Sequence, residues 1–234
     1  LLHHCKCRLH NIRPLNRPDL PTRNSPGKVC ICENNNNPVR LVFGCGSLDS
    51  LPGFLLDRRV LILTTSGFTR RGLTERVKGL AGSSIVEIID TIEPNPELSY
   101  LEETARELNK IRPEAIVALG GGSVIDTAKV FSAVLSKAEE QFSLRAHLEN
   151  SGDELVGTGI PVIAAPTTAG TGAEVTPFAT VWDSVSRRKH SLSGPQLFPE
   201  VALLDPQLTV SLPRDQTIIT GLDAISHALE AIWN

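Results

Sequence analysis

An acid and a histidine four residues apart, Asp223 and His227, lie in the last stretch of the sequence, GLDAISHALEAIWN. On a helix, side chains at this spacing bring their Cβ atoms to about 5–6 Å from each other. Such a pair suits a surface contact, and it equally suits two ligands of one divalent cation, because carboxylate and imidazole both bind Fe(II) and Zn(II). Taken alone, the spacing favours the surface pair.

The segment that carries this pair, residues 213–234, is predicted to be a helix that begins after Pro213. At about 100° per residue, its apolar side chains gather in one stripe. The stripe consists of Ile218, Ile219, Leu222, Ile225, Leu229, Ile232 and Trp233, and the other side carries Gln216, Thr220, Asp223, His227 and Glu230. The periodicity therefore places the acid and the histidine on a polar face.

Three glycine-rich loops form a second group of candidates: residues 43–47 (FGCGS), 120–123 (GGGS) and 167–172 (TTAGTG). Glycine lets backbone amides approach a phosphate closely, and parallel sheets gather ligands at the carboxyl ends of their strands. Any one of these loops could be an ordinary turn. Three in succession at predicted strand ends favour the binding of a phosphate-bearing ligand.

Two charged residues follow the second loop in GGGSVIDTAK, namely Asp126 and Lys129. Both are predicted to lie on the first turns of a helix, close to whatever the glycines bind. Asp126 could cap the helix start or meet a ligand hydroxyl, and Lys129 could be a solvated surface lysine.

The elements that must position these residues alternate along the chain. Near-continuous apolar strands are predicted at residues 39–43, 58–65, 83–90, 114–120, 160–166 and 200–205, with a helix at 96–112 and a hairpin of 178–183 with 187–193. Strands alternating with helices predict an α/β fold with a doubly wound, mostly parallel sheet, followed by the start of an all-helical second domain.

Domain boundaries follow changes in composition. Residues 1–38 are rich in Pro, Asn and Arg and are predicted to be an irregular leader, residues 39–212 the α/β domain, and residues 213–234 the first helix of a helical metal-binding domain. A zinc site of Cys-x-Cys pairs in the leader is disfavoured by its ligand spacing. The chain has no methionine, so it is expected to be truncated.

Composition excludes several classes of partner. A net charge of −3 offers no broad basic surface for nucleic acid, and no apolar run reaches the length of about 18 residues that a membrane span needs. The cysteines, at positions 5, 7, 30, 32 and 45, do not form a disulfide framework. We expect a cytoplasmic protein that binds neither nucleic acid nor membrane.

Four motifs together resemble one family. GGGSVIDTAK, PTTAGTGAEVTPFA, LLDPQLTVSLP and GLDAISHALEA, in this order and spacing, are similar to the iron-containing (group III) alcohol dehydrogenases, within the class that includes glycerol dehydrogenases and dehydroquinate synthases. The resemblance runs from about Pro38 to Asn234. TPFATVWD and GLDAISHALEAIWN look like the branch that reduces phosphonoacetaldehyde.

The resemblance implies NADH or NADPH as coenzyme. By similarity, its pyrophosphate would be bound by Gly120, Gly121, Gly122 and Ser123, its phosphates and nicotinamide ribose by Thr167, Thr168 and Thr171, and its other parts by Thr65, Asn95, Asp126 and Lys129. The strand end at residues 63–67 has no carboxylate to repel a 2′-phosphate, and Arg70 and Arg71 follow. NADPH is therefore predicted to bind at least as well as NADH.

The resemblance also turns the terminal pair into metal ligands. Asp223 and His227 look like the first two ligands of a divalent metal, Fe(II) or else Zn(II), which the family completes with two histidines further downstream. The metal would act as a Lewis acid on the substrate oxygen. Lys189 resembles a lysine near the nicotinamide, although residues 187–189 could equally be a charged hairpin edge.

These implications predict an NAD(P)- and metal-dependent alcohol dehydrogenase or aldehyde reductase, acting on a small aldehyde or alcohol and forming a homo-oligomer in full-length form. Reduction of phosphonoacetaldehyde to 2-hydroxyethylphosphonate is the specific version. The alternatives are an inactive nucleotide-binding fragment that lacks half of the metal site, and a relative of maleylacetate reductase or glycerol dehydrogenase.

Overall fold

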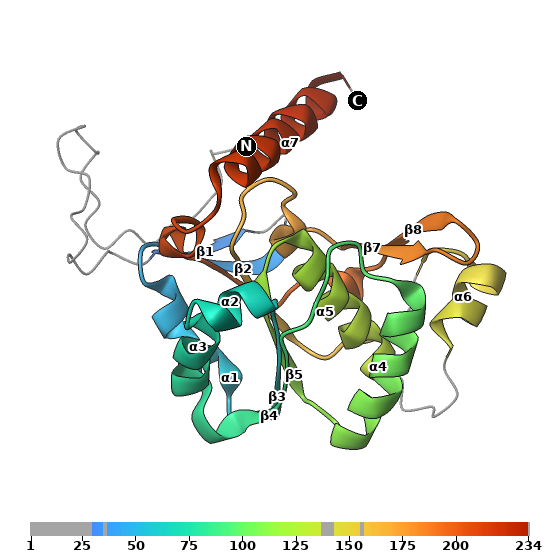
Figure 1. The fold of residues 1–234 in the computed structure, drawn as a ribbon, viewed down its shortest axis with the longest axis horizontal. Helices are drawn as coiled ribbons and strands as arrows, with labels where there is room; N and C mark the ends of the chain where they lie inside the picture. Colours follow the sequence, from blue (N-terminus) through green and yellow to red (C-terminus); the bar gives the residue numbers. More distant parts are fainter. Residues whose placement is uncertain (1–29, 35–36, 137–142, 155–156, 234) are drawn as a thin grey trace.

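The computed structural model describes residues 30–34, 37–136, 143–154 and 157–233. Within these ranges, the centre is a sheet of seven strands in the order β1-β2-β9-β6-β5-β3-β4 (Figure 1). The strands are β1 Cys30–Asn34, β2 Asn37–Phe43, β3 Val60–Leu63, β4 Ile85–Ile89, β5 Ala115–Gly120, β6 Val162–Pro166 and β9 Val201–Leu204. Neighbours are parallel, except that β1 is antiparallel to β2. The predicted α/β class with a mostly parallel sheet is confirmed.

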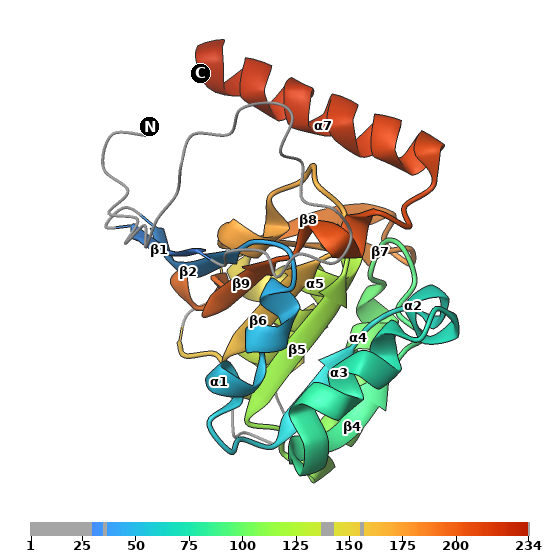
Figure 2. The ribbon, with the colours of Figure 1, turned by 90° about the vertical axis from the view of Figure 1, so that its left-hand side faces the viewer.

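Helices cover both faces of the sheet, as Figures 1 and 2 show. α4 (Leu98–Ile111), α5 (Gly122–Leu135) and α6 (Leu144–Ser151) contribute to one buried core, and α1 (Pro52–Leu55) and α3 (Leu73–Ala81) to the other. Successive residues of a strand point to opposite faces, so β5 sends Ile116 into the first core and Val117 into the second. Burial on both faces explains why the strands are almost continuously apolar.

The remaining elements are short, apart from the last helix. They are α2 (Ser66–Arg70), the 3-10 turns η1 (Ser47–Ser50), η2 (Gly82–Ser84), η3 (Ala173–Val175), η4 (Pro195–Leu197) and η5 (Pro206–Thr209), and the helix α7 (Arg214–Trp233). The structure forms α4 within the helical range predicted at 96–112, and it begins α7 directly after Pro213, as expected.

The predicted hairpin is present as a separate two-stranded sheet of β7 (Phe178–Asp183) and β8 (Arg188–Ser193). The two strands are antiparallel and place Trp182 opposite Lys189. Their inward side chains Ala179, Val181 and Leu192 belong to the same buried core as α4 and α5. The hairpin is therefore packed against the body of the domain.

Strand β1 corrects the sequence analysis. Residues 30–34, which the composition assigned to the irregular leader, pair with β2, with Cys30 opposite Phe43. An edge strand takes its order from the neighbour to which it is hydrogen-bonded, and five residues are too few to show a period of their own. Residues 37 and 38 of the predicted leader likewise belong to β2. Residues 1–29 and 35–36, which include the Cys5 and Cys7 pair of the zinc alternative, lie outside the described residues.

Helix α7 stands away from the sheet (Figure 2), and none of its residues is buried. Its predicted apolar stripe is uncovered, with exposed fractions between 44% for Leu229 and 77% for Ile232. Within the described residues, no helix combines the length and the apolar character that crossing a membrane requires. The helical periodicity therefore predicted which residues share a face of α7, but it did not predict what covers either face.

Candidate coenzyme-binding site

The turn from β5 into α5 leaves no room for a side chain at Gly120. A Cβ on Gly120 would lie 2.4 Å from a methyl carbon of Val124, one turn into the helix. Such contacts do not occur between real Cβ atoms, so only glycine allows this close approach of strand and helix. The result is an α-helix whose first amides face outward at the carboxyl end of a buried strand, an arrangement that attracts anions.

The threonine-rich loop after β6 lies against this turn. Thr167 N donates to Gly120 O over 3.0 Å, and Thr167 is buried. A Cβ on Gly121 would lie 3.2 Å from Thr168 Oγ1, and one on Gly122 would lie 3.4 Å from Thr171 Oγ1. The hydroxyls of both threonines therefore border the backbone that begins α5, and the structure brings these predicted phosphate-binding residues together.

Two further predicted residues join the same edge of the sheet. Asn95, with a left-handed φ of 62°, donates through its backbone N–H to Ser123 Oγ over 3.3 Å. Thr65 directly follows β3 and Thr64, and it precedes the first residue of α2. The loops after β6, β5, β3 and β4 are adjacent in the strand order, so they form one continuous rim.

The two arginines beyond this rim have different surroundings. Arg71 donates through Nε to Gly67 O at 2.9 Å and through Nη1 to Ser211 Oγ at 3.1 Å, and its guanidinium lies 4.4 Å from the Phe68 ring centre. Arg70 donates to Ser66 Oγ over 3.2 Å. Arg71 thus braces the connection that leads to α7, which leaves Arg70 as the better candidate for an added phosphate.

The surface alternative for Lys129 is wrong. Its side chain is fully buried, and Nζ donates to Thr176 O at 2.8 Å and to Phe178 O at 2.7 Å. Burial lowers the pKa of Lys129 to about 8, and nearby Asp126 opposes this shift.

Asp126 likewise turns toward β7, where its Oδ2 accepts from Thr180 N at 3.0 Å. Burial raises the pKa of this carboxyl, while the Thr180 N–H and the charges of Lys129 and Lys189 oppose the rise. Both side chains have backbone partners on β7, and contact of either with a coenzyme stays a prediction.

Lys189 is exposed on β8, with Nζ 5.6 Å from the ring centre of Trp182. Because it lies opposite Trp182, it is on the face of the hairpin turned away from the buried Ala179, Val181 and Leu192. A role beside the nicotinamide and a role as a charged hairpin edge are both compatible with this position.

Asp223 and His227 lie side by side on α7 and are partly exposed. Asp223 Oδ1 lies 3.9 Å from His227 Nε2, and the side chains are 39% and 53% exposed. Metal–ligand bonds of about 2.0–2.2 Å would allow both atoms to reach one ion, and the donor types suit Fe(II) or Zn(II). Among the described residues, however, no third His, Cys, Asp or Glu completes a cluster. A metal-binding role for Asp223 and His227 therefore stays a prediction.

One contact places this pair near the threonine-rich loop. A Cβ on Gly170 would lie 2.7 Å from Thr220 O, so α7 touches the loop at backbone distance. Thr220, Asp223 and His227 lie at positions i, i+3 and i+7 and share a helical face. The acid and the imidazole therefore lie on the side of α7 that meets the loop.

A carboxylate that the sequence analysis did not single out occupies the first glycine-rich loop. Asp205 is buried, and its oxygens accept from Gly46 N at 3.1 Å, Leu48 N at 3.4 Å and Gln207 N at 3.0 Å. These amides are satisfied within the protein, so the loop after β2 is held closed, unlike the turn after β5. The Asp-Pro step after an apolar run is the sequence signal for such a cap.

The fold and the paired loops define a dinucleotide-binding α/β domain, and comparison with known proteins narrows this class. A sequence profile of the iron-containing alcohol dehydrogenases matches residues 38–206. The chain therefore belongs to the iron-containing alcohol dehydrogenase family, whose members are oxidoreductases.

Individual relatives agree. The chain is 32% identical over 205 residues to the bifunctional aldehyde-alcohol dehydrogenase AdhE of Escherichia coli K12, covering 83% of this chain and 23% of that protein. It is 30% identical to the NADPH-dependent butanol dehydrogenase of Clostridium saccharobutylicum, covering 83% and 50%. Sulfoacetaldehyde reductase from Bifidobacterium kashiwanohense, solved in complex with NAD+, matches with a TM-score of 0.78 and 29% identity, covering 84% and 52%. The chain thus spans between 23% and 52% of the length of these relatives.

Proposed function

We propose that this chain supplies the coenzyme-binding part of an NAD(P)-dependent enzyme that interconverts small aldehydes and alcohols. The observation that carries the proposal is the contact between the two loops at the start of α5, where Gly121 and Gly122 meet the hydroxyls of Thr168 and Thr171. Outward amides, a helix N-terminus and hydroxyl donors at one point suit a pyrophosphate. Family membership supports the redox role.

The proposed coenzyme is NADPH, with NADH as a weaker or equal ligand. The end of β3 carries Thr64 and Thr65 and no acid, so nothing there repels a 2′-phosphate. Arg70 is exposed beside it and bonded only to a neighbouring hydroxyl among the contacts described above. An arginine in this position favours the coenzyme with the additional charge.

Asp223 and His227 are the proposed protein ligands of a divalent metal, Fe(II) or else Zn(II). Such an ion, once bound, polarises a substrate oxygen and favours the alkoxide as hydride moves to or from the nicotinamide. In this protein the two side chains would orient that ion from the face of α7 that meets the coenzyme loop. In full-length protein, Asp223→Ala is expected to abolish turnover, whereas a metal-independent maleylacetate reductase would tolerate it.

The proposed substrate is an anionic two-carbon aldehyde, with phosphonoacetaldehyde reduced to 2-hydroxyethylphosphonate as the specific case. The relative solved with NAD+ is named for sulfoacetaldehyde, whose sulfonate resembles a phosphonate in shape and charge. Arg187, Arg188 and Lys189 on the hairpin supply the positive charge that such a group would need. Homo-oligomer formation and a cytoplasmic location stay predictions.

Coenzyme binding by the 234-residue chain tests the central proposal directly. Titration with NADPH and with NADH, followed by nicotinamide fluorescence, should show saturable binding, with NADPH at least as tight as NADH. Arg70→Ala should weaken NADPH about tenfold through loss of a charge-assisted contact, and should change NADH less than about twofold. Arg106→Ala, on the exposed side of α4, is the matched control. Tighter binding of NADH by tenfold or more would contradict the coenzyme assignment.

A further inference from the structure

One edge of strand β7 is not paired with another strand of its sheet. The β7–β8 sheet has two strands, so only one side of β7 is paired with a neighbour. Unpaired backbone groups along an edge must find other partners when they are buried, or the edge remains open to foreign strands. The residues at positions 178, 180 and 182 direct backbone groups to this edge, because their contacts come from α5 and from the segment before α4.

Side chains of α5 complete the first half of this edge. Lys129 reaches two carbonyls, those of Thr176 and Phe178, and Asp126 takes the N–H of Thr180. A cation thus binds acceptors while an anion binds a donor, which is the pairing that each charge prefers. The two side chains lie three residues apart and so share one face of the helix.

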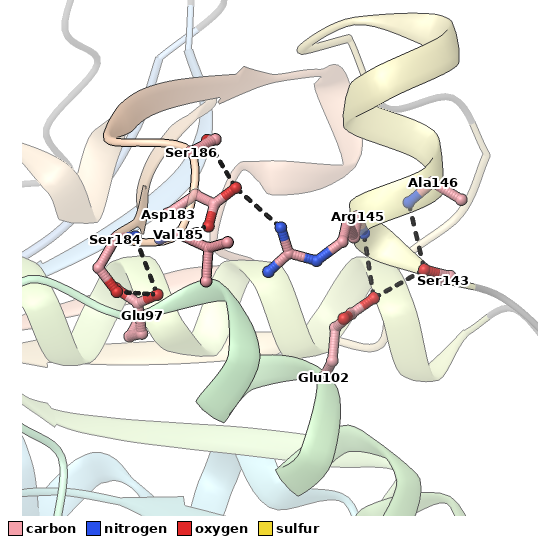
Figure 3. A network of polar contacts seen from close by, with 9 residues as sticks. All are labelled: Glu97, Glu102, Ser143, Arg145, Ala146, Asp183, Ser184, Val185 and Ser186. Carbon is pink, nitrogen blue, oxygen red and sulfur yellow. Dashed lines mark hydrogen bonds and ion pairs between the residues drawn. The ribbon is translucent and has the colours of Figure 1, made fainter.

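The other half of the edge is bound from the start of α4. Trp182 N donates to Pro96 O at 2.8 Å, and Ser184 donates to Glu97 Oε1 through its N–H at 3.1 Å and its hydroxyl at 2.8 Å. Figure 3 shows the contact between Glu97 and Ser184 beside the carboxylate of Asp183. Phe178, Thr180 and Trp182 therefore each have a backbone group that is hydrogen-bonded at this edge.

The turn of the hairpin is fixed separately. Asp183 accepts from Ser186 Oγ at 2.7 Å and from Arg145 Nη1 at 2.8 Å (Figure 3). Hydrogen bonds from Ser186 and Arg145 lower the pKa of Asp183 to about 2, although burial opposes this shift. Because the turn has its own anchors, the contacts of Asp126 and Lys129 govern mainly the part of the hairpin nearest the glycine turn.

The part of the hairpin nearest the glycine turn connects two groups of residues that are proposed to bind the coenzyme, those of the glycine turn and Lys189. Helix α5 begins at the glycine turn, and the chain from Thr171 passes through η3 to Thr176, which Lys129 holds. The far strand β8 carries Lys189. A buried lysine is costly to desolvate, and removing it would leave two carbonyls without this donor. The free-energy cost of burying Lys129 is therefore offset by hydrogen bonds that fix the positions of one loop and one hairpin.

We propose that Asp126 and Lys129 are positioning residues: they hold β7 in register with α5, and so place the Thr168–Thr171 segment and Lys189 to receive the nicotinamide half of the coenzyme. This inference rests on the proposed coenzyme function and deepens it. In this inference the two side chains bind the protein backbone and do not contact the coenzyme directly. The adenosine half, which lies toward Asn95 and Arg70, is independent of them.

Coenzyme fragments separate the two halves. In the 234-residue chain, Lys129→Met should weaken NADPH about tenfold, because two acceptors lose their donor and the hairpin shifts. The same variant should bind adenosine 2′,5′-bisphosphate, which lacks the nicotinamide half, within about twofold of the wild type. Asp126→Ala is the second variant, should Lys129→Met not fold, and Lys110→Met, on an exposed ion pair of α4, is the matched control. Equal losses for both ligands, or no loss for either, would overturn the inference.

Hydrogen exchange tests, in the absence of coenzyme, whether Asp126 and Lys129 hold β7 in place against α5. Amides of residues 178–184 should exchange about tenfold faster in either variant, while those of β5 keep the wild-type rate. Unchanged protection of β7 would refute the positioning role. Wild type that binds neither NADPH nor the bisphosphate, together with faster exchange in the variants, would refute the coenzyme function and leave the fastening of the hairpin in place.

Discussion

Helices α5 and α7 each carry an acid and a basic side chain on one face, but the structure surrounds the two pairs in opposite ways. On α5, Lys129 is fully buried and Asp126 is bonded to the backbone of β7. On α7, Asp223 and His227 are about half exposed and 3.9 Å apart. Spacing along a helix determines which side chains can meet, whereas the packing around them determines what the meeting does.

The comparison extends to the apolar residues of the two helices. In α5, ten of the residues from Val124 to Val134 are buried between the sheet and its neighbours, whereas α7 has no buried residue. α5 is accordingly a structural centre of the domain as well as the start of its candidate site. α7 approaches the domain at Gly170 through the backbone of Thr220, and none of its described residues is buried.

The same substitution made at the turn before α5 and within α7 should give the largest contrast. Gly120→Ala, at the entry to α5, would place a Cβ 2.4 Å from Val124, and should lower the free energy of unfolding by about 2–3 kcal/mol. Gly221→Ala on α7 meets nothing within 4 Å, and should leave this free energy unchanged or raise it by less than about 1 kcal/mol. Urea denaturation followed by circular dichroism measures both. Equal effects would remove the distinction between the helices.

The second contrast lies in the response to pH. The pKa of Lys129 is lowered to about 8 from the usual 10.5, so between these values the unfolded chain holds a proton that the folded chain has lost. The contribution of Lys129 to the free energy of unfolding therefore rises with pH across this window, and is least favourable below it. Relative to Lys129→Met, the wild type should gain about 1–3 kcal/mol between pH of about 7.5 and 10.5.

Urea denaturation at several pH values, with Lys110→Met as the control, measures this gain. The control removes an exposed lysine of α4 and should follow the wild type at every pH. A difference between wild type and Lys129→Met that stays constant across the window would show that the ammonium is not desolvated as the structure indicates.

The smallest effect is expected on α7. His227→Ala removes a half-exposed imidazole whose neighbour is 3.9 Å away, so the free energy of unfolding should change by less than about 0.5 kcal/mol. The measurement is again urea denaturation, with Gln216→Ala on the same helix for comparison. A loss of more than about 1 kcal/mol would show that this pair is packed like the one on α5.

Much of the fold could be predicted because it is recorded in local patterns. The apolar runs of β3, β5, β6 and most of β9 are buried, and the hairpin strands flank a short polar turn, so each was visible without knowledge of its partners. The meeting of the glycine turn with Thr168 and Thr171 depends on β5 and β6 being neighbours, which the structure shows and the sequence pattern alone did not predict. β1 could not be recognised in this way, since its order comes from β2.

The roles of single polar side chains were harder to predict, because their partners are distant in the sequence. Lys129 binds carbonyls 47 and 49 residues away, and Asp205 binds amides more than 150 residues away. No periodicity reveals such contacts, so Lys129 could be read as a surface lysine and Asp205 was not singled out. Their burial became visible only with the tertiary structure.

Because α7 approaches the threonine-rich loop at Gly170 and Thr220, a tilt of the helix would pivot about this point. At 1.5 Å per residue, Trp233 lies about 20 Å from that pivot and His227 about 10 Å. A tilt of about 10° would therefore swing the tip by more than 3 Å while moving the imidazole by less than 2 Å. If a ligand displaced the loop and tilted α7, the end of the helix at Trp233 would thus move farther than the side chains of Asp223 and His227.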